Sequence, residues 1–191
     1  MGAIAKQLPG TMTTQGFLSF LETRPEEERW QLLDGRAVMM NPPTLVHQVI
    51  AMNLAWRLND ALAAHRPELL ALVEVGLTVA ARPAFLPRAD LLVLHTPVDY
   101  VSYANRIYLT AEILSDSNTQ EYMTLKQERY AEHPDNLYSL VIAQRELRVE
   151  VRSRASGWKA EVLRSPEDIL DLPEFGFTCE LRHLYRGTPL E

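Results

Sequence analysis

The chain has 191 residues, of which 47% are hydrophobic and 23% are charged, close to the averages of folded globular proteins. These values exclude a long disordered chain, a collagen and a disulfide-stabilised scaffold. The 19 Lys and Arg residues against 25 Asp and Glu residues give a formal net charge of −6. A protein that coats nucleic acid over its whole surface should be basic, so we expect any contact with nucleic acid at a local patch.

The chain length and the even spread of 12 prolines and 8 glycines indicate one domain without an internal linker. We expect an N-terminal tail over residues 1–12 and a single domain over residues 13–191. The one cysteine, Cys179, cannot form an internal disulfide, which fits a reducing compartment. No segment has the pattern of a signal peptide, and no apolar run reaches the roughly 18 residues that span a bilayer. We therefore expect a cytoplasmic protein without membrane contact.

The first half of the chain predicts two helices, a hairpin and a strand. Thr13 precedes apolar residues at helical spacing, which predicts a short helix. Asp34-Gly35 lies between two apolar runs and predicts a β-hairpin, because both turn residues must adopt positive φ. From Thr44 to near His65, apolar residues recur every four positions, which predicts a long helix. Alternation over 73–79 predicts a strand.

The second half predicts several strands around one principal helix. Apolar or alternating runs predict strands at 90–94, 107–114, 137–143, 147–151 and 158–163. Residues from Glu121 to His133 predict a helix that Pro134 ends. Ser165-Pro166-Glu167-Asp168 has the pattern of another helix start, a hydroxyl cap followed by proline. The sum is a mixed sheet with helices in one α+β domain.

Several common catalytic and cofactor patterns are absent from the sequence. It contains no Walker-type phosphate loop, no dinucleotide-binding glycine pattern and no G-x-S-x-G elbow. The five histidines form no H-x-x-x-H pair, and one cysteine cannot form a C-x-x-C motif. A zinc site is therefore not expected.

Two carboxylates at strand positions are the first candidates for chemistry. Asp90 opens a very apolar strand, and Glu112 lies inside another. A charge within a buried strand is costly unless it is paired, hydrogen-bonded or bound to metal. If the two strands are neighbours, both side chains can converge on an oxygen-rich site of the kind that Mg²⁺ and Mn²⁺ favour. In the alternative, Asp90 caps a strand or pairs with an arginine, and Glu112 faces solvent.

Further along, Lys126 and Tyr130 lie four residues apart on the predicted helix and so share one of its faces. They can lean over a site built by the preceding strand, or they can be a solvated lysine beside a half-buried tyrosine.

The most basic stretch is another candidate for phosphate contacts. Its basic residues are Arg145, Arg148, Arg152, Arg154, Lys159 and Arg164. Glutamates are interleaved with them, and a strand face of mixed charge is a normal solvated surface. The three tryptophans are most simply core or edge aromatics.

The order and spacing of several segments resemble a known bacterial family. The segments are Gln31-Leu32-Leu33-Asp34-Gly35, Asn41-Pro42-Pro43 with His47, Ala89-Asp90, Glu112-Ile113-Leu114-Ser115, and Lys126 with Tyr130. Together they resemble the bacterial "putative restriction endonuclease" family, the Uma-type proteins of the PD-(D/E)xK nuclease-like superfamily. The resemblance runs from about residue 13 to the C-terminus.

The resemblance implies a restriction-endonuclease-like core, with a central mixed β-sheet flanked by helices. It also implies Mg²⁺ or Mn²⁺ as cofactor for the hydrolysis of phosphodiester bonds in DNA. By position, the metal ligands would be Asp90, Glu112 and the backbone carbonyl of Ile113. Lys126 would complete the catalytic set by orienting the nucleophile or stabilising the transition state. The supporting residues would be Gln31, His47 and Tyr130.

The chain also departs from the family pattern. Leu114 stands where the superfamily usually has its lysine, and Lys126 is the candidate substitute. Gln31 stands where the family usually has Glu, so that position carries no charge and cannot act as a base. Ala89 replaces the proline that usually precedes Asp90.

These departures leave three hypotheses. The first is a metal-dependent endonuclease acting on DNA, as a homodimer because enzymes of this superfamily often cut two strands with two sites. The second is a catalytically degenerate relative that binds nucleic acid or a protein. The third is an interaction protein that retains only the fold.

Overall fold

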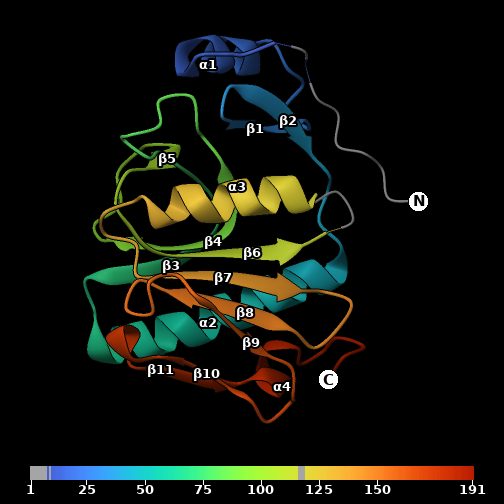
Figure 1. Cartoon of the computed structure of the whole chain (residues 1–191), viewed down its shortest axis with the longest axis vertical. Helices are drawn as coiled ribbons and strands as arrows, with labels where there is room; N and C mark the ends of the chain where they lie inside the picture. The colour runs from blue at the N-terminus through green and yellow to red at the C-terminus, as the bar shows by residue number, and fades with distance from the viewer. Residues whose placement is uncertain (1–7, 9, 116–118) are drawn as a thin grey trace.

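The structure is a computed structural model that describes residues 8, 10–115 and 119–191. A seven-stranded mixed sheet lies at its centre, with the strand order β5-β3-β4-β6-β7-β8-β9 (Figure 1). Its strands are β3 (Leu69–Leu77), β4 (Arg88–His95), β5 (Tyr103–Ala104), β6 (Ile107–Leu114), β7 (Tyr138–Ala143), β8 (Val149–Ser153) and β9 (Ala160–Leu163).

The direction of strand pairing changes at β6. Strands β3, β4 and β6 pair antiparallel in succession, whereas β6 and β7 pair parallel with Glu112 opposite Val141. A parallel pair needs a crossover connection, and α3 (Gln120–Ala131) provides part of it. Strands β7, β8 and β9 then form an antiparallel meander. The predicted strands at the centre of the sheet and the predicted helix after β6 are thus confirmed.

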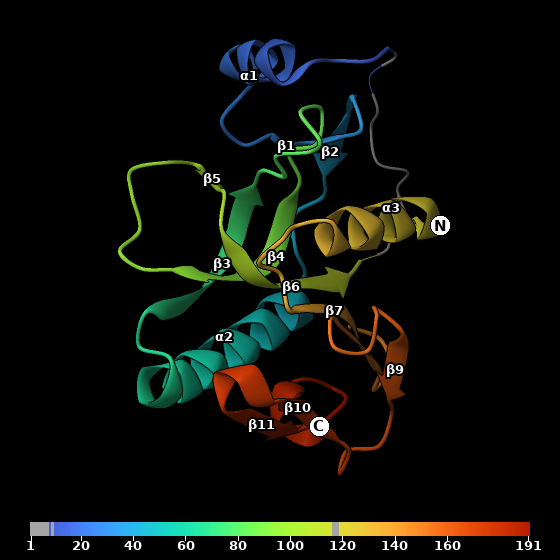
Figure 2. The same ribbon diagram turned by 60° about the vertical axis from the view of Figure 1, so that its left-hand side comes forward.

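Helices α2 (Leu45–His65) and α3 cover opposite faces of the sheet (Figure 2). The fourfold apolar spacing of α2 is its buried stripe, formed by Ile50, Leu54, Leu58 and Leu62. These side chains form the largest core with alternate residues of β6, namely Leu109, Ala111 and Ile113. The remaining residues of β6 point to the α3 face, because strand side chains alternate between faces.

The predicted hairpin is formed by β1 (Arg29–Leu33) and β2 (Arg36–Met40). Asp34 and Gly35 both have positive φ, 44° and 84°, as a two-residue turn of this kind requires. Helix α1 (Thr14–Glu22) packs on this hairpin and is capped by Thr13, as predicted. Of the predicted tail, residues 1–7 and 9 lie outside the described residues, while the N–H groups of Leu8 and Met12 donate to backbone carbonyls of the hairpin.

The predicted helix start at Ser165-Pro166-Glu167-Asp168 is wrong. The Asp168 carboxylate accepts hydrogen bonds from the N–H groups of Arg164 and Ser165, which closes a turn, and the chain continues as a strand. A local side-chain bond therefore competes successfully with helix formation.

The C-terminal elements pack beside α2 and comprise β10 (Ile169–Leu172), the 3₁₀ turn η1 (Pro173–Phe175), β11 (Phe177–Glu180) and α4 (Leu181–Leu184). Among the described residues, no helix is long and apolar enough to cross a membrane.

Candidate active site

Asp90 and Glu112 lie opposite each other on neighbouring strands. Strands β4 and β6 pair with Leu91 opposite Ala111, so continuing this register by one residue sets Asp90 against Glu112. Residues opposite each other in an antiparallel pair point to the same face. The side chain of Glu112 is only 3% exposed and that of Asp90 12%. The alternative in which Glu112 faces solvent is therefore wrong.

Helix α3 brings Lys126 and Tyr130 onto Glu112 from above. The Lys126 Nζ donates to Glu112 Oε2 at 2.8 Å and to the backbone carbonyl of Arg88 at 3.0 Å. The Tyr130 hydroxyl donates to Glu112 Oε1 at 2.6 Å. Lys126 is 2% exposed and Tyr130 is fully buried, so the interpretation of a solvated lysine beside a half-buried tyrosine is wrong.

Burial is the main cause of the pKa shifts of Glu112 and Tyr130. It raises the pKa of Glu112 above its ordinary value, and the nearby Lys126 ammonium opposes that rise. Burial together with the Glu112 carboxylate raises the pKa of Tyr130 well above 10, so its hydroxyl stays a donor. A buried ion pair of this kind is expensive to assemble, because both ions lose their hydration.

Asp90 is held from two directions. Its Oδ2 accepts a hydrogen bond from the N–H of Ile113 at 2.6 Å and lies 3.2 Å from His47 Nε2. His47 is placed by the start of α2, where the Thr44 hydroxyl caps the helix by accepting from the His47 N–H. Burial lowers the pKa of His47, but its hydrogen bond to Asp90 and the nearby carboxylates outweigh burial and raise it above 6.5.

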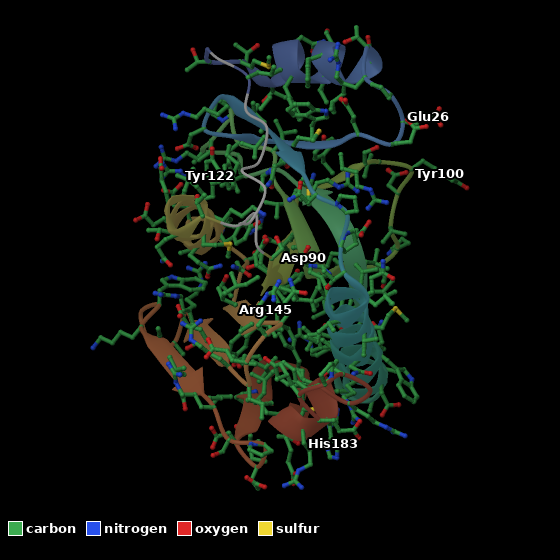
Figure 3. All side chains as sticks on the ribbon, turned by 90° about the vertical axis from the view of Figure 1, so that its right-hand side faces the viewer. Glu26, Asp90, Tyr100, Tyr122, Arg145 and His183 are labelled. Carbon is green, nitrogen blue, oxygen red and sulfur yellow. The ribbon has the colours of Figure 1, made fainter. Side chains whose placement is uncertain are left out.

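Gln31 reaches the same place from the hairpin. Its side chain is 7% exposed, and its Oε1 accepts from the N–H of Arg88 at 3.4 Å. A cavity of about 70 Å³ is lined by five of the six predicted side chains, Gln31, His47, Asp90, Glu112 and Lys126, and by Ile113. Tyr130 lies behind Glu112. In Figure 3, Asp90 lies near the middle of the molecule, between α3 and α2. The structure therefore brings all the predicted site residues together.

Three charged residues at this cavity escaped the sequence prediction. Arg29 forms an ion pair with the Glu74 carboxylate, and Arg88 Nη2 donates to the Glu74 carbonyl at 2.7 Å. Glu74 lies within β3 but has φ of +55°, a left-handed conformation that a non-glycine residue rarely adopts. Strained backbone of this kind clusters at functional sites. Arg29 lies two residues before Gln31 and Arg88 two before Asp90, so strand alternation was the signal that could have found both.

Comparison with known families identifies the chain. The family described as "Uma2: Putative restriction endonuclease" matches residues 15–182. The protein belongs to the Uma2 family. The Uma2 match includes every residue of the cavity described above, from the hairpin to α3. No curated protein matches the sequence.

Comparison with solved structures agrees with the Uma2 assignment at the level of fold. The chain is similar to a protein from Anabaena variabilis described as "a putative nuclease belonging to DUF820", with a TM-score of 0.75. The sequence identity is 18%, and the alignment covers 91% of this chain and 97% of that chain. The predicted mixed α+β fold with a restriction-endonuclease-like core is thereby confirmed.

The donor atoms at the cavity suit a hard divalent cation. Asp90 and Glu112 offer carboxylate oxygens, and Gln31 an amide oxygen, which are the ligands that Mg²⁺ and Mn²⁺ prefer. Among the described residues, the contacts of Asp90 with Ile113 and His47 both use Oδ2, so Oδ1 can face a ligand. Within the described ranges, no three His, Cys, Asp or Glu side chains converge closely enough to form a metal site of their own. A cation here would need water or substrate oxygens to complete its coordination, as is usual for Mg²⁺.

Proposed function

We propose that this protein is a divalent-metal-dependent endonuclease that hydrolyses phosphodiester bonds in DNA. The observation that carries the proposal is the arrangement of Asp90, Glu112 and Lys126 in one cavity, with two carboxylates opposite each other and one buried ammonium beside them. Membership of the Uma2 family and the fold shared with the Anabaena variabilis protein support a nuclease.

The proposed metal ligands are Asp90, Glu112 and the backbone carbonyl of Ile113, with Mg²⁺ or Mn²⁺ as the cofactor. When bound, such an ion supplies a nucleophilic water of lowered pKa and neutralises charge on the phosphate. The Ile113 N–H bond to Asp90 fixes the carboxylate that faces the cavity. The Tyr130 hydroxyl fixes Glu112 in the same way by donating to its Oε1.

Lys126 is the proposed stabiliser of the transition state. Its ammonium has three N–H donors, and the bonds to Glu112 and to the Arg88 carbonyl use two. The third can donate to a phosphate oxygen or to the attacking water. In a cavity with little water, such a preorganised charge acts more strongly than in solution.

Arg29 and Arg88 are the proposed contacts to the DNA backbone. Both guanidinium groups line the cavity and are held by Glu74. Arginine matches a phosphate with two parallel hydrogen bonds. These local positive charges allow an acidic protein to bind DNA at one patch.

The test is cleavage of a supercoiled plasmid and of a labelled duplex in Mn²⁺, Mg²⁺ or EDTA. We expect cleavage with either ion and none in EDTA. The variant Asp90→Asn should lower the rate roughly 10²–10³-fold, the scale of one lost stabilising group in a preorganised site. Asp135→Asn is the matched control, because Asp135 is half-exposed and pairs only at the surface with Arg106. Absence of cleavage by the wild type with both ions would overturn the proposal.

Two observations favour a second candidate, a DNA-binding protein without catalysis. Gln31 is neutral where Uma-type proteins usually carry a carboxylate, and Glu112 is already paired with Lys126. In that case the wild type would bind the labelled duplex with strong salt dependence and leave it uncut with either ion. Gln31→Glu would then restore metal-dependent cleavage.

The proposal extends to assembly and location. Cleavage of both strands by a single-site enzyme is simplest with two copies, so we propose a homodimer, to be tested by sedimentation velocity with and without the duplex. The buried free thiol of Cys179 fits a reducing compartment, and we propose the cytoplasm. Cell fractionation tests that location.

A further inference from the structure

A second cavity lies on the other side of α3, on the same face of the sheet. Its volume is about 430 Å³, which is within the usual range for sites of small organic ligands. Lys126 and Tyr122 of α3 line the first cavity, whereas Gln127 and Met123, one residue further on, line the second. Adjacent positions on a helix point about 100° apart, so α3 forms a wall between the two cavities.

An unpaired amide lies at this second cavity. Gln127 lines it, and both Oε1 and Nε2 of the side chain are buried without a hydrogen-bond partner among the described residues. Leaving a buried donor and acceptor unpaired costs free energy, so such groups call for an explanation. An amide offers one acceptor beside two donors, which is the pattern that pairs with the edge of a nucleobase.

An aromatic residue with a strained backbone lines the same cavity. Trp158 has φ of +64°, which is unusual for a bulky residue. Two hydrogen bonds hold its backbone: the Trp158 N–H donates to the Ser153 carbonyl, and Arg152 Nη1 donates to the Trp158 carbonyl. The Arg154 guanidinium lies over its ring, 5.4 Å from the centroid, and so covers one face of the indole. The indole is half-buried and lines the cavity, so it offers a surface on which a planar group can stack.

The positive and negative side chains that line the second cavity are equal in number. Arg148 and Arg152 both pair with Glu150, at 2.9 and 2.5 Å, and Glu128 lies on the opposite wall. With two arginines against two glutamates, the lining of this cavity carries no net positive charge that would attract a phosphate. The cavity therefore favours an uncharged, planar and hydrogen-bonding group over an anion.

The two cavities are neighbours on the same face of the sheet. Ser115 lines both of them. The registers place Glu112 opposite Val141 and Val141 opposite Glu150, so one row of side chains runs from the first cavity to the second. A strand whose phosphate lies at Asp90 therefore comes closest to the second cavity at Ser115.

We propose that the second cavity binds the base of an unpaired nucleotide, stacked on Trp158 and hydrogen-bonded by Gln127. The proposal rests on the proposed function, because it takes the nucleic acid at the first cavity as the source of the base. It makes the preferred substrate a DNA with an extruded or single-stranded nucleotide beside the scissile phosphate. Taking a base out of the stack is a known way for proteins to read it.

The experiment measures binding of two fluorescein-labelled duplexes by anisotropy, with Ca²⁺ in place of Mn²⁺ and at fixed ionic strength. One duplex is blunt and fully paired, and the other carries a single unpaired adenine. We expect the wild type to bind the second duplex roughly 10-fold more tightly, the scale of one stacked base. Free adenosine monophosphate, as a competitor, shows whether the base binds without its strand.

Two variants remove the proposed contacts without removing the fold. Trp158→Gly deletes the ring and suits the positive φ, whereas Gln127→Leu replaces a buried unpaired amide with an apolar group of similar size. Both variants should lose the preference for the unpaired adenine and keep the wild-type affinity for the blunt duplex. Gln127→Leu should also be at least as stable as the wild type, which a merely structural role for Gln127 would not allow. Trp56→Ala, at an exposed tryptophan of α2, is the control and should keep the preference.

Equal affinity of the wild type for both duplexes would overturn the inference while leaving the proposed function intact. So would a preference that survives in both variants. Failure of the wild type to bind or cleave either duplex would overturn the proposed function, and the inference with it.

Discussion

The two faces of strand β6 differ in every respect that matters for function. On the α2 face, Leu109, Ala111 and Ile113 pack into the largest apolar core. On the α3 face, Thr110 shares a hydrogen bond of 2.8 Å with Ser139, and Glu112 binds Lys126 and Tyr130. Both faces are buried. Strand β6 thus has apolar side chains on its α2 face and a row of polar side chains on its α3 face.

Under the proposed function, the apolar face of β6 stabilises the fold and the polar face carries the chemistry. Burial of apolar groups stabilises the sheet from the α2 side without any requirement for exact chemistry. The polar row gains little net stability, because each group gives up hydrogen bonds to water. Its arrangement makes sense as preparation for a ligand, since Asp90 joins the same face from β4.

The largest expected effect is on the polar face. Glu112→Ala leaves the Lys126 ammonium buried without its carboxylate, so the free energy of unfolding should fall by about 3–5 kcal/mol. Urea unfolding in EDTA measures the loss. The double variant Glu112→Leu with Lys126→Met removes both charges and should recover most of the stability. If the double variant is as unstable as the sum of the two single variants, the pair is not a coupled buried ion pair.

A comparable change on the apolar face should act on stability alone. Leu109→Ala removes a fully buried side chain from the α2 core, and the free energy of unfolding should fall by about 3 kcal/mol. At a temperature where the variant remains folded, its cleavage rate per molecule should equal that of the wild type. A large loss of rate in a folded Leu109→Ala protein would show that the two faces are not separable.

The smallest expected effect concerns the neutral end of the polar row. Ser139→Ala removes the partner of Thr110 and should cost about 1 kcal/mol of unfolding free energy, the value of one buried hydrogen bond. Thermal or urea unfolding measures it, and cleavage should not change, because Ser139 lies away from the first cavity. The variant Ser139→Thr keeps the hydroxyl and serves as the comparison.

Local patterns made most of the fold predictable. The Asp34-Gly35 turn and the fourfold spacing of α2 depend on residues close in sequence, and both appear as expected. The Ser165-Pro166 pattern failed because the Asp168 side chain bonded backwards to the preceding backbone and closed a turn. Proline after a hydroxyl residue fits either structure, so the sequence alone did not decide.

The candidate site was predictable only in part. A carboxylate inside the apolar run of β6 drew attention to Glu112, and spacing put Lys126 and Tyr130 on one helix face. The α3 face that carries Lys126 and Tyr130 is buried because α3 crosses over β6. No local sequence pattern predicts this crossover. Arg29 and Glu74 reach the site from a hairpin and a strand far apart in sequence, so their ion pair is a long-range contact that no local pattern contains.

The most direct test of the account is calorimetric titration of the purified protein with Mn²⁺, alone and with the uncut duplex present. We predict that the wild type and Asp135→Asn bind Mn²⁺, and that Asp90→Asn and Glu112→Gln, which keep the size of each side chain, do not. Equal binding by all four proteins would place the metal elsewhere. No binding by the wild type, even with duplex DNA, would contradict the claim that the polar face of β6 is a metal-dependent active site.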